Sequence, residues 1–158
     1  CLPHYVTDKN VALFETHKVF SAAEMRARCA IMAENYCKVT RIEAVTMLEM
    51  ADHDILPAVS AYCDTLTERL SHRAGRYEQE TLALLSKLLD DAYDARCRLE
   101  KALEHTAGGA DEHAADLYRD EVLPAMRSLR EAADAMEVRM PANAWPFPSY
   151  GELLFSVK

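Results

Sequence analysis

The stretch Ser21-Ala-Ala-Glu-Met-Arg-Ala-Arg-Cys29 decides the fold class. Ser21 and Glu24 have the spacing of a capping box, in which each side chain accepts a hydrogen bond from the backbone amide of the other. After this box, apolar side chains recur at alternating intervals of four and three residues, at Met25, Cys29, Met32, Tyr36 and Val39. That period belongs to one face of a helix, so the sequence predicts a long helix beginning at about residue 22.

The helical period continues to about residue 74, through a second run of apolar positions at Ala44, Leu48, Ala51, Ile55, Val59, Tyr62 and Leu66. We expect the helix over 22–74 to bend at two places. One is near residue 40, where β-branched side chains cluster between Val39 and Ile42. The other is near Pro57, which lacks a helical amide and is expected to kink the helix rather than to end it.

Three further helices are predicted, over 8–18, 78–106 and 111–138, and the last contains Pro124. In the second, an apolar period that Arg96 interrupts runs through Leu82, Leu85, Leu89, Ala92, Leu99 and Leu103. In the third, the apolar period runs through Val122, Met126, Leu129, Ala133, Met136 and Met140. Gly75 and the pair Gly108-Gly109 stand at the breaks between the long helices. No stretch alternates apolar and polar residues as a half-buried strand does. With 158 residues, the chain has the length of one domain. We therefore predict a single all-α domain over 1–158, folded as an elongated antiparallel bundle of long helices.

The last segment, 141–158, differs from the rest. It carries three prolines, so it is not helical throughout. It also carries four aromatic residues, Trp145, Phe147, Tyr150 and Phe155. We expect an extended aromatic and proline-rich C-terminal tail, docked on its own bundle or on a neighbour.

Charge and cysteine content narrow the possible functions. Eighteen basic and 26 acidic residues give 18 − 26 = −8, which does not favour binding to nucleic acid or to anionic lipid. The five cysteines are odd in number and form no Cys-x-x-Cys pair. We interpret Cys29, Cys37 and Cys63 as small apolar residues in a reducing compartment. No signal peptide is visible, and we expect a cytoplasmic protein.

The sequence offers little catalytic chemistry. A di-iron site in a bundle needs Glu-x-x-His on two helices. The residues three positions before the candidate histidines are instead Met50, Arg69, Ala102 and Ala110. Glu49 and His53 share a helix face, and Asp52 and Asp54 flank that histidine, but no partner elsewhere is evident. No phosphate-binding glycine loop or hydrolase motif occurs. We predict no catalytic, cofactor-binding or metal-binding residue in this chain.

Four stretches resemble a known family: Lys9-Asn-Val-Ala-Leu-Phe-Glu-Thr-His17, Ile42-Glu-Ala-Val-Thr-Met-Leu-Glu-Met50, Ile55-Leu-Pro-Ala-Val59 and Trp145-Pro-Phe-Pro-Ser-Tyr-Gly-Glu-Leu-Leu-Phe155. In this order, with long helices between them, they look like the C-terminal region of the type III glutamine synthetases. These are large bacterial glutamate–ammonia ligases.

The resemblance implies a parent enzyme of glutamine biosynthesis, in nitrogen metabolism. It would ligate ammonia to glutamate with ATP and a divalent cation, Mg or Mn, through a γ-glutamyl phosphate. The resemblance also implies stacked hexameric rings and catalytic residues in upstream domains. This chain would then have a structural role, with the catalytic domain of the same chain and neighbouring subunits as its partners. The first residue, Cys1, is not methionine, which fits a piece of a larger enzyme.

Two other interpretations stay open. A free-standing helical bundle could act as an interaction or sensor module without enzymatic activity, with the tail as its docking peptide. A small helical enzyme could use a site that the sequence does not reveal, because nucleophile and base need only meet in space.

Overall fold

A computed structural model describes residues 2–73, 75–106, 112–148 and 150–155. In these ranges the chain forms helices and no strand, so the predicted all-α class is confirmed. The elements in chain order are α1 (Leu2–Tyr5), α2 (Asp8–Thr16), α3 (Ala22–Met50), η1 (Ala51–Ile55), α4 (Leu56–His72), α5 (Arg76–His105), α6 (Glu112–Leu117), η2 (Tyr118–Val122), α7 (Leu123–Glu137) and α8 (Tyr150–Phe155).

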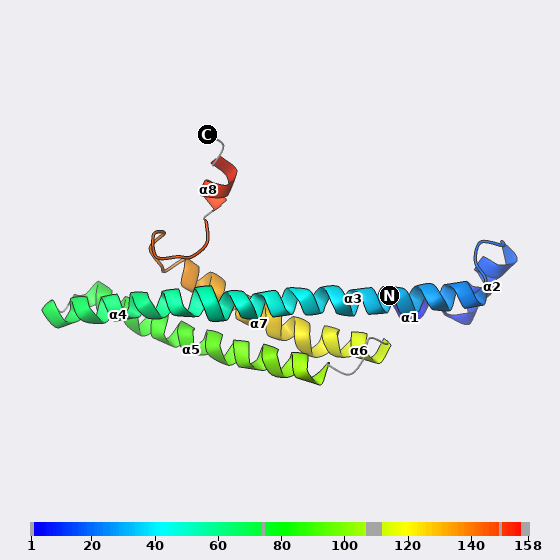
Figure 1. The fold of residues 1–158 in the computed structure, drawn as a ribbon, viewed down its shortest axis with the longest axis horizontal. Helices are drawn as coiled ribbons and strands as arrows, with labels where there is room; N and C mark the ends of the chain where they lie inside the picture. Colours follow the sequence, from blue (N-terminus) through cyan, green and yellow to red (C-terminus); the bar gives the residue numbers. More distant parts are fainter. Residues whose placement is uncertain (1, 74, 107–111, 149, 156–158) are drawn as a thin grey trace.

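Three long helical segments make the bundle (Figure 1). The first is one continuous rod, in which α3, η1 and α4 follow one another without a break. The second is α5, which runs back along α4, and the third is α6, η2 and α7, which runs antiparallel to α5. α5 packs chiefly on α4 and α7, and α3 also packs on α6 and α7. This is the expected elongated antiparallel bundle.

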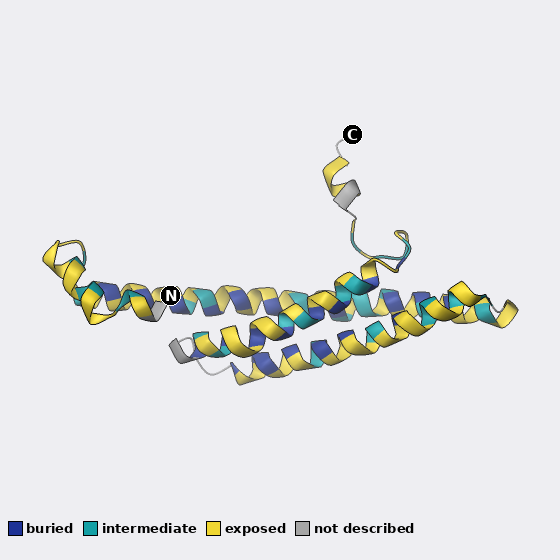
Figure 2. Cartoon of the chain, turned by 180° about the vertical axis from the view of Figure 1, so that it is seen from behind, coloured by how far each residue is buried: buried dark blue, intermediate teal, exposed yellow. Residues whose placement is uncertain are grey.

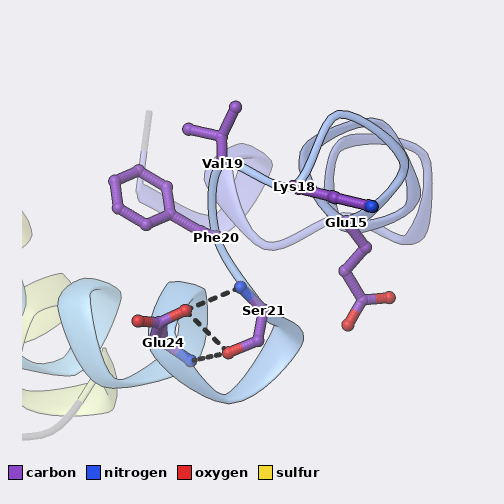
Figure 3. A pocket seen from close by; sticks show the side chains of 6 residues that line it. All are labelled: Glu15, Lys18, Val19, Phe20, Ser21 and Glu24. Carbon is purple, nitrogen blue, oxygen red and sulfur yellow. Dashed lines mark hydrogen bonds between the residues drawn. The ribbon is translucent and has the colours of Figure 1, made fainter.

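The predicted capping box starts the rod (Figure 3). The Ser21 hydroxyl accepts a hydrogen bond from the Glu24 amide at 3.3 Å, and the Glu24 carboxylate accepts one from the Ser21 amide at 2.8 Å. The bond from the Ser21 amide, together with a second one that the Ser21 hydroxyl donates to the same carboxylate, holds the pKa of Glu24 below its ordinary value, because both favour the charged form. Next to the box, the Arg28 guanidinium lies 4.4 Å from the centre of the Phe20 ring.

The buried face of α3 differs from the predicted one. Met32 and Val39 were expected to face the core, but they are 43% and 46% exposed. The buried positions are mostly small residues, at Met25, Cys29, Ala33, Cys37, Thr40 and Ala44. Small side chains let neighbouring helices approach closely, so the core contact runs along them and the larger apolar side chains are left outside. The prediction is therefore wrong for Met32 and Val39, whereas Met25 and Cys29 are buried as predicted and Tyr36 packs against the core.

Both prolines inside the bundle follow a π-helical turn. Ile55-Leu-Pro-Ala-Val59 and Val122-Leu-Pro-Ala-Met126 are similar stretches, and η1 and η2 immediately precede their Leu-Pro pairs. In an α-helix, a proline ring meets the carbonyl four residues earlier and offers that carbonyl no amide. Here the amides of Leu56 and Leu123 bond to carbonyls five residues back. The widened turn accommodates the proline, and the helix continues.

The irregularities predicted for the rod lie near residues 40 and 57. α3 is α-helical through Thr40, and the bend expected there stays a prediction. The second expected irregularity takes the form of η1, just before Pro57. Gly75 lies at the break before α5, as expected, and is its N-cap. Gly108, Gly109 and Asp111 lie outside the described residues.

The core fills the space between α4, α5 and α7. Its largest fully buried side chains there include Leu66, Leu85, Leu99 and Met136. These residues belong to the apolar faces predicted for the second half of the rod and for the two later helices. Figure 2 shows the buried positions recurring along the bundle, with exposed positions between them.

Only a short part of the tail packs against the bundle. Ala144 and Trp145 pack against the core, and the Trp145 ring meets the edge of Phe147 with 6.3 Å between ring centres. Beyond them α8 stands away from the bundle (Figure 1), and Leu154 and Phe155 are 69% and 83% exposed. The prediction of a tail docked over 141–158 is therefore not confirmed for α8. Ser149 and 156–158 lie outside the described residues.

Candidate docking surface

Of the acidic residues around His53, Asp52 forms an ion pair with Arg96. The Arg96 guanidinium, on α5, donates to both oxygens of the Asp52 carboxylate, at 2.9 Å from Nε and 2.8 Å from Nη2. Arg96 also pairs with Glu100. These hydrogen bonds, chiefly the one to Asp52, raise the pKa of Arg96 above its ordinary value and keep the guanidinium charged. Asp52 therefore ties η1 to α5.

The other candidate groups do not converge on one point. Within the ranges that the structure describes, no three His, Cys, Asp or Glu side chains could hold a metal ion together. Burial raises the pKa of the Cys63 thiol, which makes it a weak nucleophile at neutral pH. The predicted lack of catalytic and metal-binding residues stays a prediction.

A groove runs between the rod and α7 and is bounded by the tail. Its volume is about 480 Å³. Apolar and aromatic side chains make most of its wall, among them Met47, Ile55, Leu129, Trp145 and Leu153. An ion pair between Arg130 and Asp134, 3.5 Å apart, lies on the α7 side. The tail's packing therefore forms one wall of this groove.

A second apolar surface lies on the rod itself. Five large apolar side chains of α3 point away from the core, and we call them the α3 ridge: Ile31 (63% exposed), Met32, Val39, Ile42 (66% exposed) and Val45. Ile31 and Ile42 are eleven residues apart, which is close to three helical turns, so they lie on one line along the helix. The ridge is about 21 Å long at 1.5 Å per residue. It lies opposite the buried face.

Two polar neighbours of the ridge, Lys38 and Thr46, have partners within α3. Lys38 pairs with Glu34 at 2.6 Å, within the same helix. The Thr46 hydroxyl donates to the Ile42 carbonyl at 2.9 Å. A partner that covered the ridge would therefore leave these groups with a hydrogen bond or an ion pair inside α3, which lowers the cost of removing water from them.

The prediction from sequence missed the ridge because it placed Met32 and Val39 in the core. One signal could have revealed it. Large apolar residues occur all around α3, whereas a helix with one solvent face shows them on one side. Such a helix is normally covered on both sides, which makes the ridge the strongest candidate for a docking surface.

Among the described residues, no helix is both long and apolar enough to cross a membrane.

Comparisons with known proteins agree with one another. The family model described as glutamine synthetase C-terminal domain matches residues 1–73. A glutamine synthetase of Butyrivibrio fibrisolvens is 32% identical over all of this chain and 24% of its own length. A type-3 glutamine synthetase of Dictyostelium discoideum is 26% identical over 94% of the chain and 22% of its own. A glutamine synthetase of Bacteroides fragilis is 24% identical over 98% of the chain and 23% of its own. The chain thus spans about a quarter of these relatives.

Proposed function

We propose that this chain, which belongs to the family of glutamine synthetase C-terminal domains, is a helical scaffold of its parent enzyme and carries no catalytic group itself. Its partners are the catalytic part of the same polypeptide and neighbouring subunits of a homo-oligomer. The parent ligates ammonia to glutamate, with ATP and a divalent cation such as Mg or Mn. The parent is cytoplasmic, where ATP is available.

One observation carries this proposal. The similarity to the Butyrivibrio protein covers all of this chain but only 24% of that protein, so about three quarters of a parent of that size lies outside the chain. That remainder is long enough to hold the whole reaction. The bundle, in contrast, supplies long helices and apolar surfaces.

The residues present do not fit an ATP or metal site. A divalent cation with ATP needs oxygen ligands gathered at one place, and the described part of the chain gathers no such set. The sequence also has no glycine-rich loop to hold phosphates. We therefore assign no step of the reaction to this chain.

Two assays test the proposal. In the first, the isolated chain receives glutamate, hydroxylamine, ATP and Mg²⁺, with the full-length parent as the positive control. We expect γ-glutamyl hydroxamate from the parent only, and product from the isolated chain would overturn the non-catalytic role. In the second, the parent is expressed without these 158 residues. We expect loss of assembly and of activity, and an unchanged oligomer would overturn the scaffold role.

A further inference from the structure

We infer that the α3 ridge docks onto the preceding part of the same polypeptide, with an apolar surface of that part as its occupant. This inference rests on the proposed function and adds to it the surface and the partner. It identifies one face of one helix as the contact between the bundle and the rest of the parent.

The first argument is the contrast between α3 and α5. The core occupies the side of α3 that carries Cys37 and Ala44, yet the opposite side presents Ile31 and Ile42, both more than 60% exposed. α5 instead exposes mainly charged side chains between its buried positions, among them Lys87, Asp90, Asp91, Asp94 and Glu100. Val39, Ile42 and Val45 adjoin at intervals of three residues, and Asn35 and Lys38 separate them from Ile31. An apolar patch that stays in water is unfavourable, so this part of α3 has the surface of a helix with partners on two sides.

The second argument concerns the cost of covering the ridge. Lys38 and Thr46, which lie beside it, are already bonded within α3. Docking therefore leaves these two groups bonded while it removes the apolar side chains of the ridge from water, and apolar burial is the main favourable contribution to association.

The third argument decides between the same polypeptide and a second copy of this domain. A covalently linked partner has a high effective concentration, in the millimolar range for short linkers. Two copies of this domain carry −8 each, so pairing their bundles brings −8 + −8 = −16 together and is opposed by repulsion. α1 also packs on α3, so the beginning of this chain lies beside the helix with the ridge (Figure 1).

Site-specific crosslinking in the full-length parent tests the contact. The photoreactive residue p-benzoylphenylalanine replaces Ile42 on the ridge or, as a control, Val138, which is 80% exposed and lies off the ridge. Subunits labelled with different isotopes are mixed, so that products within one chain and between chains have different masses. We expect position 42 to crosslink to residues upstream of this domain in the same chain. Products that join two copies, or a yield no higher than that at position 138, would overturn the inference.

A pair of substitutions gives an independent measurement. Ile42→Asp places a charge in the proposed contact, and Val138→Asp places the same charge at an exposed position elsewhere. Without the burial of this isoleucine, the affinity of docking should fall about tenfold. Limited proteolysis should then release the domain about tenfold faster. Val138→Asp should release it at the wild-type rate. Equal rates for the two variants would overturn the inference.

The two proposals can fail separately. If deleting the whole domain leaves assembly and activity unchanged, the scaffold role fails. If deletion abolishes assembly, while Ile42→Asp releases the domain at the rate of Val138→Asp and the photoreactive residue at position 42 crosslinks nothing upstream, the scaffold role stands and the ridge is not its contact.

Discussion

Each of the two π-helical turns precedes a Leu-Pro pair, yet different interactions hold the two turns against the bundle. The first residue of η1 is the small Ala51, and the turn is tied to α5 by the ion pair of Asp52 with Arg96. The first residue of η2 is Tyr118, which is 2% exposed, and its last residue, Val122, is fully buried. The polar contact between η2 and α5 joins the His105 imidazole to the Glu121 carboxylate at 3.2 Å and lies in solvent.

The difference separates what the local sequence determines from what packing determines. Each proline requires a wider turn before it, because its ring and missing amide disturb an ordinary α-helical turn. The neighbour α5 then determines how each turn is anchored. At η1 the small Ala51 is buried and Arg96 adds an ion pair, whereas at η2 Tyr118 and Val122 are buried, so charge contributes more at η1 and burial more at η2.

The largest effect is expected from removing the buried anchor of η2. Tyr118→Ala should lower the free energy of unfolding by about 3–5 kcal/mol, because it leaves a cavity between helices. Chemical denaturation of the chain measures this loss. Tyr93→Ala is the matched control, since that side chain is 57% exposed. Equal losses for the two variants would contradict anchoring by burial.

A smaller effect is expected at η1. Arg96→Met keeps the aliphatic stem but removes the guanidinium, and should cost about 1.5–3 kcal/mol, the range for hydrogen bonds to charged groups. The change leaves Asp52 without its partner. Adding Asp52→Asn should recover part of the loss, because the unpaired charge is then gone. A double variant less stable than Arg96→Met alone would contradict this account.

The exposed contact of η2 should matter less. Glu121→Gln is expected to change the free energy of unfolding by at most about 1 kcal/mol, as for other surface ion pairs. High salt should remove even this difference, because it screens exposed charges. Denaturation at low and at high salt measures both. A loss as large as that of Arg96→Met would show that charge anchors both turns.

The smallest net effects are expected from the prolines. Pro57→Ala and Pro124→Ala each restore an amide but also give the unfolded chain more freedom, so the net change should stay below about 1 kcal/mol. Hydrogen exchange should show a protected amide at the substituted position. An unprotected amide at one position would show that its turn stays open without proline.

Much of the fold could be predicted from local sequence. The capping box at Ser21 and the apolar periods that contain Leu85, Leu99 and Met136 are local signals. Each is formed by residues only three or four positions apart in the sequence. The pairing of Asp52 with Arg96 could not be predicted in this way, because the two residues are 44 positions apart and meet only through packing. In the sequence, Arg96 appears only as an interruption of an apolar period.

The docking surface was harder to predict than the fold. Met32 and Val39 were assigned to the core because they continue the apolar spacing of four and three residues that begins at Met25. The structure instead buries Ala33 and Cys37, since close approach of helices favours small residues there. Burial on one side of a helix does not exclude a second contact on the other, and only a structure separates the two faces.

The unbroken rod of α3, η1 and α4 has a mechanical consequence. It comprises 72 − 22 + 1 = 51 residues and is about 75 Å long at the usual rise per residue. In a stiff lever of that length, a tilt of about 5° at one end moves the other end by roughly 7 Å. Small changes of packing around α4 would therefore become large displacements near α1 and α2.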